Sequence, residues 1–131
     1  MNEDLTTVYE DWPYVRIQQH IKSREGIPVE FVIQLEYNMN PDMGNPSVHD
    51  WRQVARFDHR HGGAHDVRYN GLHMDVYKQG HKYRIARNFP GVPIEEAPQY
   101  CLDYFKRRLK QLVSRFERLH DIDKEELIEN R

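Results

Sequence analysis

The sequence contains a single cysteine, Cys101, among its 131 residues. One cysteine excludes an internal disulfide, which favours a reducing cytosol, and its apolar, helix-like neighbours indicate a packed side chain rather than a nucleophile. No basic-then-apolar leader opens the chain, and no apolar run approaches the length of a membrane-spanning helix. These absences lead us to expect a soluble protein of the cytoplasm that has no membrane partner.

The sequence also lacks a strong charge of one sign and a large apolar fraction. Its formal net charge is -2, so the molecule as a whole does not point to a polyanion partner. Hydrophobic residues make up 38% and charged residues 31% of the chain, which suits a thin core between a sheet and one or two helices. With no internal repeat and no low-complexity segment, the whole chain, residues 1–131, is expected to be a single domain.

What the sequence does contain is a clear alternation of hydrophobic and polar residues over residues 14–89, which predicts an antiparallel sheet. We predict about five strands joined as a meander, because short turns containing Gly26 and Gly80 separate successive strands. Residues 1–12 have few apolar positions and are expected to form a loose arm or a short helix. The clearest strand carries Val29, Phe31, Ile33, Leu35 and Tyr37 on its core face.

Two further strands have their faces predicted from the same alternation. In the strand that begins at Trp51, this residue is expected to share the core face with Ala55 and Phe57. In the last strand, Tyr83 and Ile85 are expected to face the core.

A long helix is predicted from about residue 94 to residue 120, followed by an acidic tail at residues 121–131. The helix has an apolar stripe that recurs every three or four residues: Ala97, Cys101, Phe105, Leu109, Leu112, Phe116 and Leu119. The predicted fold class is therefore α+β, an antiparallel β-meander of about five strands with a long C-terminal helix packed on one face. The other face of the sheet is polar and free.

Histidines are concentrated in the turn after the strand that begins at Trp51. Five of the eight histidines lie between His59 and His81, and arginines and aspartates surround them. Imidazoles titrate near neutral pH, and a neighbouring carboxylate can orient them for acid–base chemistry. A solvated turn with incidental histidines is the alternative. The predicted catalytic residues are Arg56, Asp58, His61, His65 and Asp66, with His61 and His65 as acid and base, Arg56 as the phosphate contact, and Asp58 or Asp66 as the orienting carboxylate.

A divalent metal site is a second interpretation of this turn. His59, His61 and His65, with Asp58 or Asp66, supply enough nitrogen and oxygen ligands for a metal ion. Their spacing matches no strong metal-binding signature. We otherwise expect no cofactor.

Further polar residues are predicted to extend the site across the free face of the sheet. His73, Asp75 and Tyr77 share one parity of a strand, and Arg84 or Lys82 lies on its neighbour. Ordinary cross-strand charge pairing is the alternative explanation. The predicted substrate-binding residues are His59, Arg60, His73, Asp75, Tyr77 and Arg84. The basic stretch at residues 106–118 is either a phosphate-contacting surface or, as we favour, a solvated helix face.

Two stretches carry a resemblance to known proteins. They are the strand Phe31-Val-Ile-Gln-Leu-Glu-Tyr and the segment Trp51-Arg-Gln-Val-Ala-Arg-Phe-Asp-His-Arg-His-Gly-Gly-Ala-His-Asp-Val. Together they resemble a family of small prokaryotic domains of unknown function, which share a Gln-Leu-Glu-Tyr strand and an Arg-(Phe/Tyr)-Asp pair followed by a His-Gly-x-Ala-His turn. The second stretch is also distantly similar to the RNA-acting toxins of toxin–antitoxin pairs.

The resemblance to the toxins implies an RNA-acting protein of the ribonuclease type, with the catalytic residues named above as the positions to test. It also implies an antitoxin-like protein partner, and a dimer is one option for the oligomeric state. Two alternatives stay open at this point: a non-catalytic binding or interaction module, and a metal-dependent hydrolase.

Overall fold

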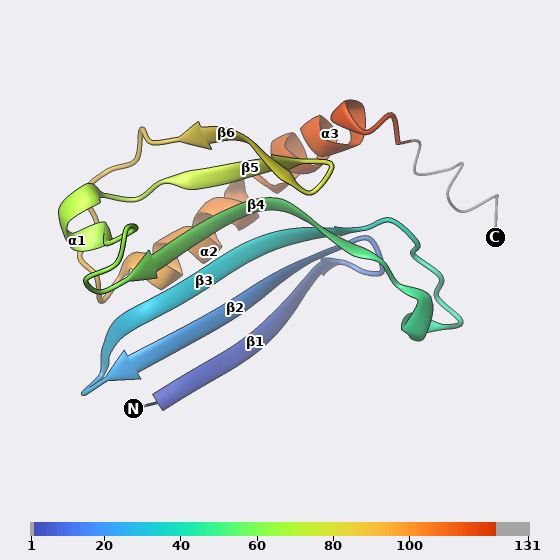
Figure 1. The fold of residues 1–131 in the computed structure, drawn as a ribbon. Coiled ribbons are helices and arrows are strands. Elements are labelled where there is room, and N and C mark those ends of the chain that lie inside the picture. The colour runs from blue at the N-terminus through green and yellow to red at the C-terminus, as the bar shows by residue number, and fades with distance from the viewer. Residues whose placement is uncertain (1, 123–131) are drawn as a thin grey trace.

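Residues 2–122 are described by the structure, a computed structural model, and they form a six-stranded sheet with two helices behind it (Figure 1). All neighbouring strands are antiparallel and lie in chain order, so the α+β class and the meander are confirmed, with six strands instead of about five. The strands are β1 (Asn2–Asp11), β2 (Val15–Arg24), β3 (Ile27–Asn38), β4 (Trp51–Arg60), β5 (Met74–Lys78) and β6 (His81–Ala86). The predicted acidic tail lies outside the described residues from residue 123 onward.

The additional strand is β1, which occupies the residues that were predicted to form a loose arm or a short helix. It pairs with β2 from Asn2 opposite Ser23 to Asp11 opposite Val15. Most of its side chains are exposed, and Val8 packs against the core. An edge strand that is held mainly by backbone hydrogen bonds needs little hydrophobic alternation, which explains why the sequence pattern did not reveal it.

Two hairpins close through two-residue turns, as the sequence predicted. Glu25 and Gly26 join β2 to β3 with φ values of 52° and 79°, and Gln79 and Gly80 join β5 to β6 with φ values of 53° and 78°. Two successive residues with positive φ form the tight turn that matches the twist of paired strands, and glycine takes this conformation at no steric cost.

Two short helices replace the single long helix that was predicted. They are α2 (Ala97–Arg107) and α3 (Leu109–Leu119), and Arg108 between them leaves the helical conformation at φ -103° and ψ 11°. The apolar stripe continues across this break, and no proline or glycine marks it in the sequence. Both helices keep apolar residues in the core across the break, since Phe105 of α2 and Leu112 of α3 are buried. Among the described residues, no helix has both the length and the apolar character needed to cross a membrane.

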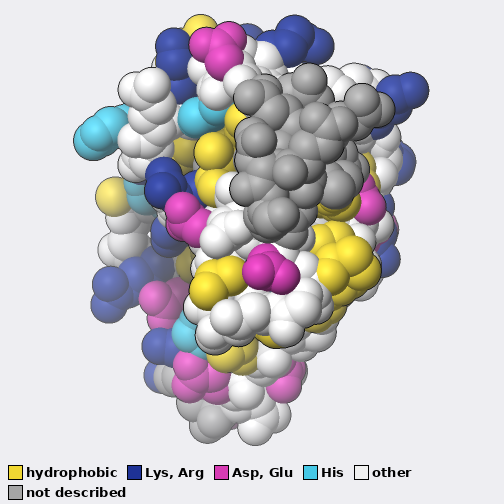
Figure 2. Space-filling model, turned by 90° about the vertical axis from the view of Figure 1, so that its right-hand side faces the viewer, with side chains coloured by type: hydrophobic (Ala, Val, Ile, Leu, Met, Phe, Trp, Pro, Cys, Tyr) yellow, Lys and Arg dark blue, Asp and Glu magenta, His cyan; other side chains and the backbone are white. Residues whose placement is uncertain are grey.

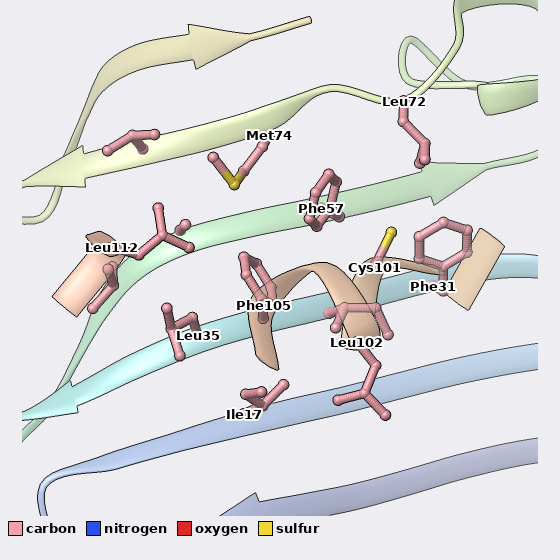
Figure 3. Packing of buried hydrophobic residues seen from close by; sticks show 14 of the residues in the cluster. Ile17, Phe31, Leu35, Phe57, Leu72, Met74, Cys101, Leu102, Phe105 and Leu112 are labelled. Carbon is pink, nitrogen blue, oxygen red and sulfur yellow. The ribbon is translucent and has the colours of Figure 1, made fainter. Parts of the chain in front are cut away.

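The hydrophobic core lies between the sheet and these two helices (Figure 3). Cross-strand rows supply the sheet side of the core, as the alternation predicted: Ile17, Leu35, Ala55 and Val76 form one row across β2 to β5. Cys101 is completely buried, and burial raises the pKa of its thiol, so the prediction of a packed, unreactive cysteine is supported. The helices contribute Ala97, Cys101, Leu102, Phe105, Leu112 and Phe116.

The opposite side of the sheet is not covered by α2 or α3, and we call it the free face. Its polar character is confirmed by the strand register. Gln18, Gln34, Arg56 and Asp75 lie opposite one another in successive strands, one residue out of phase with the hydrophobic row. The alternation of side chains along each strand explains why one face is apolar and the other polar.

A β-bulge moves Trp51 to the free face, so the prediction that it shares a face with Ala55 is wrong. The register between β3 and β4 shifts between Ala55 and Gln53, which makes Val54 an additional residue in β4. One extra residue reverses the side-chain alternation before it. The indole of Trp51 therefore lies under the guanidinium of Arg16 on the free face, with 4.2 Å between the Arg16 Cζ and the ring centroid.

A second register shift reverses the predicted faces in β6. Arg84 lies opposite Val76, on the side of the helices, and Ile85 lies opposite Asp75, on the free face. Tyr83 is the additional residue of this bulge. Tyr83 is 54% exposed and Ile85 45% exposed, so the prediction that they face the core is wrong.

Candidate functional site

The turn between β4 and β5 is held together by Asp66. Its carboxylate accepts hydrogen bonds from the backbone N–H groups of Gly62 (2.8 Å) and Arg68 (3.1 Å) and forms an ion pair of 2.8 Å with the Arg68 guanidinium. Asp66 also caps the short helix α1 (Val67–Asn70). The hydrogen bond from Arg68 holds the pKa of this carboxyl well below its usual range. Asp66 is therefore fully used in shaping the turn.

His59 lies on the face of the sheet that the helices cover. Its ring stacks on Phe31, and its Nδ1 accepts a hydrogen bond of 3.0 Å from the backbone N–H of Val67. Burial lowers its pKa to about 4, so the imidazole is neutral near pH 7. The ring of His61 contacts this buried ring at 4.7 Å between centroids. These two histidines thus lie apart from the free face, where Arg56 and Asp58 point.

Five of the predicted residues do converge on the free face, and we call them the free-face cluster: Arg56, Asp58, His65, His73 and Asp75. β4 supplies Arg56 and Asp58, the turn supplies His65 and His73, and β5 supplies Asp75. The rings of His65 and His73 are 4.4 Å apart between centroids. Arg56 Nε donates a hydrogen bond of 3.1 Å to Asp58 Oδ2. The cluster therefore joins residues from two neighbouring strands and from a turn that folds back over them.

His73 stands at the centre of this cluster. Its Nε2 atom lies 4.0 Å from Asp58 Oδ1 and 4.0 Å from Asp75 Oδ1. Only 4% of the residue is exposed, and Nε2 has no hydrogen-bond partner among the described residues. Burial lowers the pKa of His73, while the charge of Asp75 acts in the opposite direction. The imidazole is thus neutral near pH 7, with a ring nitrogen available for a proton or a ligand.

Asp75 is the most deeply buried acid of the cluster, with 1% of the residue exposed. Neither carboxylate oxygen accepts a hydrogen bond from another described residue. The Nζ atom of Lys82 lies 3.3 Å from Oδ2, which is an ion-pair contact rather than a hydrogen bond. A buried carboxylate without hydrogen bonds is costly, by several kcal/mol for an isolated charge. Buried carboxylates with unused oxygen atoms occur at functional sites, and Asp75 is therefore a candidate functional residue.

Asp58, His65 and His73 lie close enough together to hold a metal ion. Each offers one ligating atom, and the three atoms lie within 4.8 Å of one another. Two imidazoles and one carboxylate that leave other positions open form a recurrent ligand set for divalent transition metals. The predicted ligand set was different: of His59, His61 and His65, only His65 belongs to this group. The sequence pattern favoured histidines that are close in number, but the strand separates their side chains onto two faces.

A pocket of about 300 Å³ lies beside the cluster. Arg56, Asp58, Arg60, Gly63 and His65 line part of it. The charged residues of its lining are two arginines and two acids, Arg56, Arg60, Glu30 and Asp58, so an anionic group that enters this space can be contacted by the two guanidinium groups.

The remaining predicted substrate-binding residues are distributed over the sheet. Tyr77 is buried on the free face, and burial raises the pKa of its hydroxyl. Arg84 is exposed on the other side of the sheet, as described above. The central position of His73 was missed by the prediction, which placed it among the substrate-binding residues. A turn and a short helix separate His65 from His73 in the chain. No sequence pattern therefore indicates that their rings meet. The capping role of Asp66 had a signal, because aspartate is a preferred residue immediately before a helix.

The chain was compared with known proteins. No curated protein matches it, and no solved structure matches it. Residues 1–122 match a family profile described as a domain of unknown function, DUF7718. Because this match covers nearly the whole chain, the protein belongs to the DUF7718 family.

Proposed function

We propose that the free-face cluster is the catalytic centre of a cytoplasmic, metal-dependent hydrolase that cleaves RNA. The observation that carries the proposal is the convergence of Asp58, His65 and His73, whose ligating atoms lie within 4.8 Å of one another. The neutral, buried His73 supports it, because Nε2 has no other partner among the described residues. A divalent metal held by Asp58, His65 and His73 would activate a water for attack and would offset negative charge on a phosphate oxygen.

The protein's own residues supply the other parts of the reaction. Arg56 is one-third exposed and lines the pocket, so its guanidinium is in position to bind a phosphate oxygen. Asp75 has a carboxylate free of hydrogen bonds and is the proton acceptor in this proposal. It takes one proton from the attacking water as the new P–O bond forms, and returns it to the departing oxygen as the old P–O bond breaks.

RNA is the proposed substrate for two reasons. The pocket beside the cluster is lined by Arg56 and Arg60, which suits a phosphodiester. The Arg-(Phe/Tyr)-Asp pair and the histidine-rich turn are similar to those of RNA-acting toxins. The same resemblance leads us to propose that an antitoxin-like protein binds and controls this one.

A second candidate is RNA cleavage by acid–base chemistry without a metal. It is supported by the contact of the His65 and His73 rings, at 4.4 Å between centroids, beside Arg56 and Asp58. One imidazole would take the proton of the ribose 2′-hydroxyl, and the other would protonate the leaving oxygen. His65 is the more exposed of the two rings and lines the pocket beside the cluster. This pair replaces the predicted pair of His61 and His65.

One experiment separates these functions. Cleavage of a labelled RNA is measured in chelator and after Mg²⁺, Mn²⁺ or Zn²⁺ is added back, for the natural protein and for H65A and H73A. H61A and H81A are the matched controls, because these histidines lie outside the cluster. Activity that is lost in chelator and restored by a metal supports the proposed function. Activity that persists in chelator but is lost in H65A and H73A supports the acid–base candidate. Tight RNA binding with no cleavage under any condition overturns both in favour of a binding module.

A further inference from the structure

Four rings form a contiguous group at the end of the sheet where β1 ends and β4 begins, and we call this group the aromatic platform: Tyr9, Trp12, His49 and Trp51. Tyr9 and Trp12 meet edge to face at 4.9 Å between centroids, and Trp12 and His49 at 5.4 Å. His49 and Trp51 lie 5.9 Å apart, and Tyr9 and Trp51 6.4 Å. Each ring therefore contacts two others, and the group is one surface.

Two of the four rings of the aromatic platform are exposed, and the other two are partly buried. Tyr9 is 51% exposed and Trp12 is 43% exposed. Figure 2 looks onto this end of the molecule and shows hydrophobic side chains at the surface among acidic ones. Contiguous apolar surface of this kind on a small protein usually marks a binding site. The four rings do not belong to the hydrophobic core, so packing in the core does not explain why they are grouped.

The platform is continuous with the free face. The bulge at Val54 turns Trp51 to this side, and Tyr9 lies opposite Arg16 in the β1–β2 ladder. The guanidinium of Arg16 lies over the Trp51 ring at 4.2 Å and forms an ion pair of 2.7 Å with Glu36. One guanidinium thus lies against the rings at one end of the same face that carries the free-face cluster at the other.

The distance between the two sites sets the size of a shared ligand. Trp51 and Asp58 are both in β4 and lie seven residues apart, which corresponds to about 23 Å along a strand. A stacked nucleic-acid strand advances about 3.4 Å per nucleotide, so about seven nucleotides bridge the two sites. A single nucleotide cannot contact both.

We propose that the aromatic platform binds unpaired bases of the RNA substrate by stacking and so directs the strand across the free face to the cluster. This inference rests on the proposed function and adds the substrate class, single-stranded RNA. Exposed aromatic rings with an arginine plane on a sheet surface are a recurrent means of holding splayed bases. A protein partner would bury the rings equally well, but it would not explain why they share one face of the sheet with the phosphate-binding cluster.

The test uses the fact that Trp12 and Trp51 are the only two tryptophans of the chain. Their intrinsic fluorescence therefore reports on the platform without a label. Unstructured RNA oligonucleotides of 3 and 12 nucleotides, and a 12-base-pair duplex, are titrated into the protein in chelator, which prevents metal-dependent cleavage. We expect saturable quenching with the 12-nucleotide strand and at least tenfold weaker binding of both the short strand and the duplex.

Variants assign the binding to the platform. Y9A and W12A should each weaken binding of the 12-nucleotide strand about tenfold or more, since stacking on one ring carries much of the affinity per base. Y69A and Y83A are the controls, because each removes an exposed ring outside the platform. Both variants keep the two tryptophans, and their RNA binding, measured by the same fluorescence quenching, should be unchanged. Y9L and W12L keep an apolar contact for the fold, and a thermal melt shows whether each variant is folded. Folded Y9L and W12L must also bind weakly.

The outcomes are distinct from those of the proposed function. Unchanged RNA affinity in folded Y9L and W12L overturns the platform proposal, whatever the cleavage result. Self-association of the natural protein that is lost in W12L, with no RNA quenching, overturns it in favour of an interface between two copies. If folded Y9L and W12L bind the 12-nucleotide strand weakly but cleave a 3-nucleotide substrate at an unchanged rate, the platform proposal is supported. Absence of cleavage in all proteins, with normal quenching, overturns the proposed chemistry alone.

Discussion

Asp58 and His59 are neighbours in β4, yet their side chains have opposite surroundings. His59 points into the core, stacks on Phe31 and has its Nδ1 satisfied by the N–H of Val67. Asp58 points to the free face, where it meets Arg56 and lies near His73. The dense group of histidines in the sequence is therefore two groups in space. The Nε2 atoms of His59, His61 and His73 all lack a hydrogen-bond partner among the described residues, but only that of His73 lies 4.0 Å from each of two carboxylates.

A similar contrast separates the two most deeply buried acids among the described residues, Asp66 and Asp75. Asp66 accepts hydrogen bonds from Gly62 and Arg68, and every contact serves the turn. Asp75 is equally buried but accepts no hydrogen bond among the described residues. Burial alone thus does not identify a functional acid. What distinguishes the two acids is whether their carboxylate oxygens already accept hydrogen bonds, because a carboxylate with all its oxygens occupied has no capacity left for a ligand.

The largest expected effect concerns the rate of RNA cleavage. H73A should reduce this rate by about 100-fold or more, because either proposed chemistry needs the His73 ring nitrogen. H61A should change it by less than about twofold, since the His61 ring contacts His59 instead. Initial rates on a labelled RNA measure both. Equal losses in the two variants would remove the distinction between the groups.

The next effect is on the free energy of unfolding as a function of pH. Burial lowers the pKa of His59 from 6.5 to about 4, so between these values the unfolded chain binds a proton that the folded protein does not. The stabilisation is complete above pH 6.5 and is lost as the pH falls towards 4, by up to about 3 kcal/mol. H59Q keeps an acceptor for the Val67 N–H without titrating, and should flatten this dependence. Urea unfolding at pH 7.5 and pH 4.5 measures it, and an unchanged slope in H59Q would contradict the assignment.

A somewhat smaller effect is expected from metal binding to the free-face cluster. A divalent metal at 100 times its dissociation constant should raise the free energy of unfolding by about 2.7 kcal/mol, because it binds the folded state. D58N and H65A should abolish this gain, while H61A should retain it. Thermal melts with and without Mn²⁺ or Zn²⁺ record the change. A gain that survives in D58N and H65A would mean that the metal binds elsewhere.

The smallest effect distinguishes the two faces of β6. Lys82 lies on the free face with its Nζ 3.3 Å from the buried carboxylate of Asp75, whereas Arg84 is exposed on the other side. K82A should lower the free energy of unfolding by about 1 kcal/mol, because Asp75 loses its cation. R84A should change it by less than about 0.5 kcal/mol. Urea unfolding of both variants at pH 7.5 tests the comparison, and a larger loss in R84A would reverse the face assignment.

Much of the candidate site was predictable because side-chain alternation is a local property of a strand. Arg56, Asp58 and Asp75 were each predicted to lie on the polar face, and the register confirms this. The errors occurred where one residue was added or where the chain turned. Val54 moved Trp51 to the free face, and the bulge at Tyr83 moved Arg84 away from it. No residue type in either bulge signals the insertion, since bulges arise from pairing with a neighbouring strand.

The sequence by itself determined the α+β class, the meander, the tight turns at Gly26 and Gly80, and the division of the sheet into an apolar and a polar face. All of these follow from periodicity and from the φ that glycine permits, which are properties of short segments. Only the tertiary structure decided that the chain breaks its helix at Arg108, that His65 meets His73, and that Trp51 joins the aromatic platform. These depend on register, bulges and the path of a turn, which are set by contacts between residues distant in the chain.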